Sequence, residues 1–255
     1  MPVWPTMHDL TPYNPAFMRL DLLLLILATA LSYPLGLWLR QPWLLPVLNA
    51  LPAYVVLAHR LRRGERGGAV RAMLVWAIVV ALTATILFVW WPEPVGAVVI
   101  HGPAYKAELF GWIRTGQGAE GNIRLFLPQH LRDLAVFIVV GLLTAGAGAV
   151  VMGAVLMNYM AYYVAALARA GAPPWAVTLL GWQPWAIARV LAFCTLGVIL
   201  AEPLLFRLMP AARGRLKMAG GAAYLVAAMS GILAEWFLKA TFAPIWGRWL
   251  HRLLP

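Results

Sequence analysis

The sequence predicts an all-α protein, a polytopic bundle of transmembrane helices. Only 11% of its 255 residues are charged, whereas soluble domains carry about 25%. The mean hydropathy is +0.79. The apolar residues form continuous runs, and a run of about 20 residues is long enough to cross a bilayer as a helix. Because membrane-spanning strands alternate apolar and polar residues, the continuous runs exclude a barrel of strands.

We expect one integral membrane domain over residues 1–255 with about six spans, at residues 17–39, 43–58, 72–91, 134–168, 185–209 and 218–242. The second segment is short and carries Pro46, Asn49 and Pro52. It is therefore either a distorted span or a re-entrant element. The tail at 244–254 alternates aromatic or leucine residues with arginine and histidine, which predicts an interfacial helix.

The fourth predicted span, 134–168, is too long for a single crossing. Its 35 residues would reach about 50 Å as a helix, against a hydrocarbon core of about 30 Å. The helix must therefore tilt, protrude or break. Gly141, Gly146, Gly148 and Gly153 offer places for a break.

The formal charge of +11 comes from basic residues in short segments beside the spans. This placement is typical of cytoplasmic loops and favours anionic lipid headgroups as partners over nucleic acid. The two most basic segments are 59–71 and 207–217. Three single spans between them would put the segments on opposite sides of the membrane, which conflicts with the positive-inside rule. We give more weight to 59–71, because its charge is denser, and expect a bacterial inner-membrane protein.

Polar residues concentrate in an insert at 92–133, which the first basic segment places on the extracytoplasmic side. Four of the nine acidic residues fall there, together with two of the five histidines. The sequence predicts a helix that begins at Pro103 and ends near Thr115–Gly116. Tyr105, Glu108 and Trp112 would share one face of that helix. We expect the insert to form a helical cap over the bundle.

The insert supplies the candidates for chemistry. Glu108, Glu120, His101 and His130 are the candidate catalytic residues. As a ligand set, His101, Glu108 and His130 would suit Zn, Mn or Fe. Their spacing matches no established metal motif, so no cofactor is predicted and a metal ion is the alternative. The competing interpretation is an interfacial helix in which Glu108 pairs with Lys106 or Arg114.

Ionisable residues inside predicted spans include Asp21, Arg189, Glu202, Glu235 and Lys239. Of the polar residues there, the candidate site residues are Asn158, Arg189, Glu202 and Glu235. A charge at mid-helix costs about 2.5–3.5 kcal/mol or more, so each such residue calls for a partner. The last two spans should form an antiparallel hairpin, which places Arg189 beside Glu235. We predict an ion pair between these two residues. We expect Asn158 to form hydrogen bonds between helices. The only cysteine, Cys194, excludes a disulfide within the chain.

Three functions are compatible with these patterns. The leading hypothesis is a non-enzymatic, permease-like or assembly subunit that works with other membrane proteins. The alternative is a membrane-embedded enzyme, metal-dependent or not, acting on a lipid-linked or small substrate at the extracytoplasmic face. The third is an autonomous transporter, which would need a polar path along Asn158, Arg189, Glu202 and Glu235.

Overall fold

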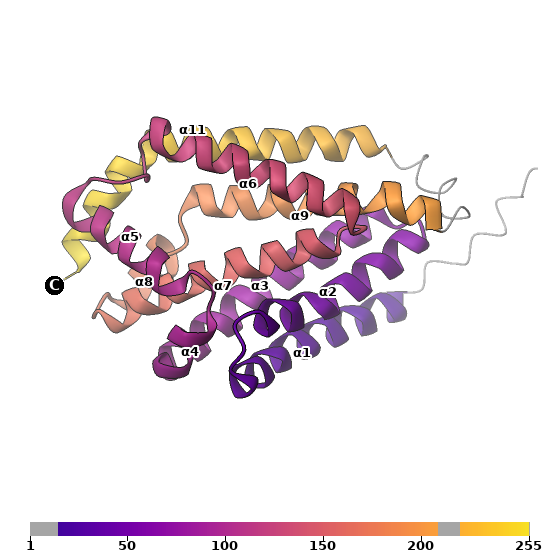
Figure 1. Ribbon diagram of the computed structural model, residues 1–255, viewed down its shortest axis with the longest axis horizontal. Coiled ribbons are helices and arrows are strands. Elements are labelled where there is room, and N and C mark those ends of the chain that lie inside the picture. Colours follow the sequence, from indigo (N-terminus) through magenta and orange to yellow (C-terminus); the bar gives the residue numbers. More distant parts are fainter. Residues whose placement is uncertain (1–14, 209–219, 255) are drawn as a thin grey trace, which may run out of the picture.

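The computed structural model describes residues 15–208 and 220–254, with side chains from residue 20 onward. Within these residues the secondary structure is helical. Seven helices are long and apolar enough to cross a membrane, which confirms the predicted fold class. They are α1 (Pro15–Leu39), α2 (Leu44–Arg62), α3 (Arg66–Trp90), α6 (Ile123–Leu143), α7 (Ala147–Arg169), α9 (Pro184–Leu208) and α11 (Gly221–Leu253). Three short helices lie at one end of the bundle (Figure 1): α4 (Pro92–Val98), α5 (Gly102–Thr115) and α8 (Pro174–Leu180).

The structure has one more candidate span than expected, because the run at 134–168 is not a single helix. The chain turns back between α6 and α7, where Ala145 and Gly146 have φ angles of 51° and 86°. A Cβ atom at Gly146 would lie 2.7 Å from Cβ of Ala201 in α9, so only glycine fits this turn. α6 also begins at Ile123, inside the segment expected to be a polar insert. The insert outside the spans therefore ends at residue 122.

Two other expected boundaries also differ from the structure. α2 is an uninterrupted helix as far as Arg62, with Pro52 in its interior, and is not re-entrant. The span expected at 218–242 and the interfacial helix expected at 244–254 belong to one helix, α11. The end of α11 turns away from the direction of the bundle (Figure 1), and Pro244, which cannot donate a backbone hydrogen bond, lies within this helix.

The extra span removes the orientation conflict. Four spans, α3, α6, α7 and α9, now separate the two basic segments, which places them at the same end. Arg66 at the start of α3 forms an ion pair with Glu202 near the end of α9, and its guanidinium lies 5.8 Å from the ring centroid of Tyr224 in α11. Residues 209–219, with most of the second basic segment, lie outside the described residues. The positive-inside rule predicts that this end faces the cytoplasm and that the end carrying α4, α5 and α8 faces the extracytoplasmic side.

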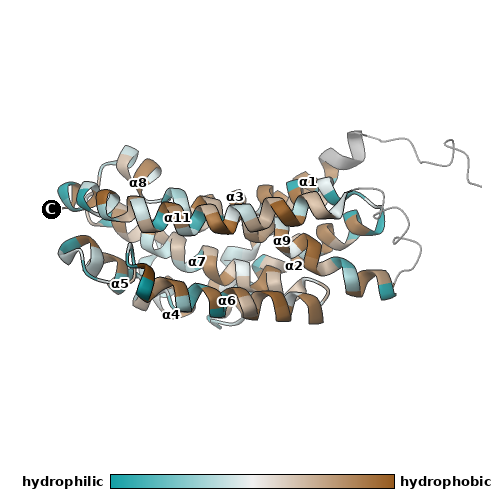
Figure 2. Ribbon diagram, turned by 90° about the horizontal axis from the view of Figure 1, so that it is seen from above, coloured by the Kyte–Doolittle hydropathy of each residue, from teal (hydrophilic) through white to brown (hydrophobic). Residues whose placement is uncertain are grey.

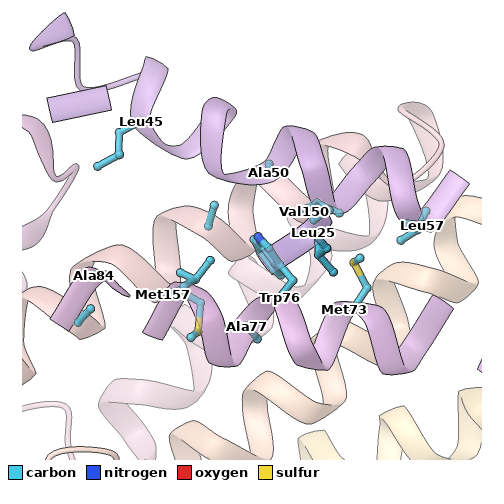
Figure 3. Packing of buried hydrophobic residues seen from close by; sticks show 14 of the residues in the cluster. Leu25, Leu45, Ala50, Leu57, Met73, Trp76, Ala77, Ala84, Val150 and Met157 are labelled. Atoms are coloured by element: carbon cyan, nitrogen blue, oxygen red, sulfur yellow. The ribbon is translucent and has the colours of Figure 1, made fainter. Parts of the chain in front are cut away.

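The main core lies where α1, α2, α3 and α7 meet. Figure 3 shows Trp76 and Met73 of α3 packed with Met157 and Val150 of α7. α7 is the most deeply buried span, with 67% of its apolar window inside the bundle. Hydrophobic residues follow the long helices, and hydrophilic ones gather mainly toward the two ends (Figure 2). This distribution is expected for helices whose outer faces contact lipid.

Candidate functional site

A cavity of about 510 Å³ lies between the short helix α5 and the spans α6, α7, α9 and α11. All four candidate residues of the insert line it: His101, Glu108, Glu120 and His130. Its mouth is formed by exposed residues of α5 and the start of α6, at the end predicted to face the extracytoplasmic side. The structure thus brings the four candidates to one cavity, although they arise from different segments of the chain.

Inside the cavity, Arg189 of α9 and Glu235 of α11 form the predicted ion pair. Nε of Arg189 lies 2.6 Å from Oε1 of Glu235, whose side chain is 2% exposed. α9 and α11 are antiparallel neighbours, so residues far apart in the sequence lie at the same depth. The pairing gives each charge the partner that burial requires.

His130 of α6 completes this cluster. Its Nε2 lies 3.1 Å from Nη2 of Arg189, and its Nδ1 lies 3.3 Å from Oε1 of Glu235. Because arginine can only donate, Nε2 must accept the hydrogen bond, and the ring proton then lies on Nδ1. Nδ1 is buried and has no hydrogen-bond partner among the described residues, although it lies close to the carboxylate. In this arrangement His130 is a positioning residue for Arg189, because its one lone pair accepts from that residue.

A second ion pair closes the cavity on the α11 side. Nζ of Lys239 lies 2.8 Å from Oε1 of Glu120, and the two side chains are 4% and 5% exposed. The ammonium also lies 5.0 Å from the ring centroid of Phe126. Sequence reasoning did not find this pair. The available signal was the spacing of Glu235 and Lys239, which are one helical turn apart and therefore face the same side of α11.

The predicted helix of the insert is confirmed as α5, which ends at Gly116 with a φ of 70°. Tyr105 of α5 packs on Tyr159 of α7, with ring centroids 4.5 Å apart. Burial, followed by the negative charge of Glu120, raises the pKa of the Tyr105 hydroxyl well above its ordinary value. Trp112, on the same side of α5, is buried against Gly247 of α11.

Glu108 lies exposed at the mouth of the cavity and forms no ion pair with the side chains that the structure describes. The pairing suggested for it with Lys106 or Arg114 is not formed, because both cations lie over the ring of Phe110 instead. Desolvation, and then the charge of Glu120, raise the pKa of Glu108, while Lys239 acts in the opposite direction.

The three candidate metal ligands line the same cavity without forming a ligand set. Among residues 15–208 and 220–254, no three His, Cys, Asp or Glu side chains come together in a group that could hold a metal ion. Nε2 of His130 accepts from Arg189, and His101 is an exposed residue with a left-handed backbone (φ 60°) before α5. His101, Glu108 and His130 therefore stay separate side chains.

The other two intramembrane polar residues lie outside the cavity. Asn158 forms hydrogen bonds between helices, as predicted: its Oδ1 accepts from Tyr33 of α1 at 2.7 Å, and its Nδ2 donates to Asn49 of α2 at 2.8 Å. Glu202 is held by Arg66, at the end of the bundle opposite α5. The four residues therefore do not share one polar path. Arg189 and Glu235 belong to the cavity, and Asn158 and Glu202 hold helices together.

Comparisons with protein-family models, curated proteins and solved structures find no match to this chain. The functional interpretation therefore follows from the position, charges and walls of the cavity.

Proposed function

We propose that this protein is a permease-like membrane component, alone or as a subunit of a complex in a bacterial inner membrane. Its cavity would receive a small solute from the extracytoplasmic side. One observation carries the proposal: charged side chains line a cavity of about 510 Å³ among membrane-spanning helices. Small-molecule sites have volumes of about 300–1,000 Å³ and combine apolar walls with a few polar groups.

The depth of the cavity supports this function. Ile232 of α11 lines its inner part and lies eleven residues after Gly221, the first residue of that helix. At 1.5 Å per residue, this is about 16 Å along α11 from its cytoplasmic start. Ile232 therefore lies near the middle of a hydrocarbon core of about 30 Å. Binding sites of membrane transporters lie at this depth.

Apolar side chains close the inner end of the cavity. Leu134, Met152 and Phe193 line this part, and Phe193 packs on Phe137 with ring centroids 4.6 Å apart. The polar cluster around Asn158 does not line the cavity. In this conformation a solute could enter from one side only. Passage to the cytoplasm would require α6 and α9 to separate at this aromatic contact, as in alternating access.

The outer faces of the bundle suit contact with lipid chains or with other membrane subunits. Exposed apolar side chains follow α6, among them Leu131, Val139 and Leu143, which are 48%, 53% and 72% exposed. Apolar residues of this kind are stable only where hydrocarbon or another apolar surface covers them. Anionic lipids would neutralise the basic cytoplasmic end.

Cysteine accessibility tests the proposed function. Cys194 is the only cysteine, so Cys194→Ala provides a background without thiols. In that background, we expect Met152→Cys to react with a water-soluble, membrane-impermeant maleimide added to right-side-out vesicles. In inside-out vesicles the same cysteine should react more slowly, because the aromatic contact separates it from the cytoplasm.

Leu233→Cys is the matched control. Leu233 lies next to the cavity residue Ile232 but is 58% exposed on the outer face of α11. A thiol in hydrocarbon stays protonated and reacts poorly. If Met152→Cys is as unreactive as Leu233→Cys from both sides, the bundle is closed and dry, and the proposed function is wrong.

A further inference from the structure

We infer that the cavity selects a small organic cation with an ammonium group and an apolar remainder. This inference rests on the proposed function and names the class of solute. It follows from three independent properties of the cavity: the charge that remains after its ion pairs are formed, a buried carboxylate oxygen with no partner, and the aromatic rings near the mouth.

The charged residues of the cavity leave one carboxylate unpaired. Three ion pairs account for six of the seven acidic and basic lining residues: Arg189 with Glu235, Lys239 with Glu120, and Arg132 with Asp133. The seventh is Glu108, at the mouth. The two lining histidines, His101 and His130, are counted as neutral. An entering cation therefore meets a net negative charge, and an entering anion is repelled.

Glu120 adds an acceptor deeper inside. Its Oε1 accepts from Lys239, but its buried Oε2 has no hydrogen-bond partner among the described residues. The side chain is 5% exposed. A buried carboxylate oxygen without a donor keeps a negative charge that no hydrogen bond offsets, and this charge favours a cation in the cavity. Glu108 and Glu120 line the same cavity, so a cation inside it would be attracted by both.

The two buried cations of the cavity, Arg189 and Lys239, are each held by a carboxylate, whereas Glu108 forms no ion pair with the described side chains. Two nitrogens of Arg189 are bound to Glu235, and one of these also contacts His130. The ammonium of Lys239 is 4% exposed and contacts both Glu120 and the Phe126 ring. An anionic solute would have to break these contacts before it could pair with either residue.

Aromatic and aliphatic walls match the remainder of such a solute. Tyr105, Tyr159 and Trp236 line the cavity, and the rings of the two tyrosines pack at a tilt of 49°. The face of an aromatic ring attracts a cation, most strongly when water is excluded. Below the charged residues, Leu134 and Met152 offer an apolar surface for the hydrocarbon part of the solute.

Two thiol reagents of similar size and opposite charge test this inference. One is 2-(trimethylammonium)ethyl methanethiosulfonate and the other is 2-sulfonatoethyl methanethiosulfonate. For Met152→Cys in the Cys194→Ala background, we measure the ratio of the labelling rate with the cationic reagent to the rate with the anionic reagent. This ratio is divided by the ratio measured at an exposed loop thiol, Gln117→Cys. We expect the normalised preference for the cationic reagent to be about tenfold. In addition, n-hexylammonium should slow the labelling of Met152→Cys, whereas hexanoate and hexanol should not.

Matched substitutions connect the preference to the cavity. Glu108→Gln should reduce the cationic preference at Met152→Cys several-fold, whereas Glu93→Gln, which removes a carboxylate of α4 outside the cavity, should leave it unchanged. Equal rates for both reagents, or protection by hexanoate or hexanol as strong as that by hexylammonium, would overturn the inference while leaving the cavity accessible. A thiol that reacts with neither reagent would instead refute the proposed function.

Discussion

Replacing Glu235 by leucine is expected to destabilise the protein by about 3–5 kcal/mol, because it leaves Arg189 as a buried charge without a counter-ion. Glu235 is 2% exposed, and its Oε1 contacts two nitrogens of Arg189. The substitution therefore removes both the counter-ion of Arg189 and the acceptor of its hydrogen bond. Thermal and denaturant-induced unfolding of the purified protein in detergent would measure the loss.

The double variant Arg189→Met, Glu235→Leu is the control for this prediction. Replacing both members of a buried ion pair with apolar residues is often neutral or stabilising. We expect the double variant to recover most of the stability that Glu235→Leu loses. If Glu235→Leu unfolds at the same temperature as the original protein, the pair does not hold α9 to α11.

Asn158→Leu is expected to cost about 2 kcal/mol of stability. The Asn158 amide connects α7 to α1 through Tyr33 and to α2 through Asn49. Asn49 in turn donates a hydrogen bond to Ser32, so these side chains form a polar chain of hydrogen bonds. The substitution leaves two buried polar groups, the Tyr33 hydroxyl and Oδ1 of Asn49, without this hydrogen-bond partner. Each unpaired group costs about 1–3 kcal/mol of stability. We expect the low end of that range, because hydrogen bonds between membrane helices average about 0.6 kcal/mol. The Tyr33 hydroxyl also keeps a weak alternative acceptor, the carbonyl of Val80 at 3.4 Å.

Tyr33→Phe provides the matched comparison, because it removes one end of the same chain and leaves Asn158 bound to Asn49. Its loss of stability should be smaller than that of Asn158→Leu. Unfolding curves recorded in the same detergent would compare the two variants. An Asn158→Leu protein as stable as the unchanged one would show that the polar chain contributes nothing to holding α1, α2 and α7 together.

Those features that depend on local sequence were predicted well. Long apolar runs form helices in a membrane whatever their neighbours are, so the fold class followed from composition and from these runs. α5 was predicted because Pro103 and Gly116 favour the two ends of a helix. The pair between Arg189 and Glu235 followed from the antiparallel hairpin geometry of two consecutive spans.

Features that depend on contacts between distant segments were not predicted. The turn at Gly146 interrupts an apolar run in which four glycines were equal candidates, and the close approach of Ala201 distinguishes this one. α6 begins inside the polar segment because its first turns line a cavity, so hydropathy alone placed its start too late. The contact between Lys239 and Glu120 joins residues 119 positions apart, and the spacing of residues along a helix cannot predict a contact between such distant segments.

Orientation in the membrane decides which compartment supplies the solute, and it can be measured directly. Gln117 is exposed in the connection between α5 and α6, and Arg63 is exposed in the turn between α2 and α3, at the opposite end of the bundle. Gln117→Cys and Arg63→Cys, each in the Cys194→Ala background, would be treated in intact cells with an impermeant maleimide. We predict that Gln117→Cys is labelled and that Arg63→Cys reacts only after the cells are opened. The reverse pattern would place the cavity on the cytoplasmic side and contradict uptake from outside.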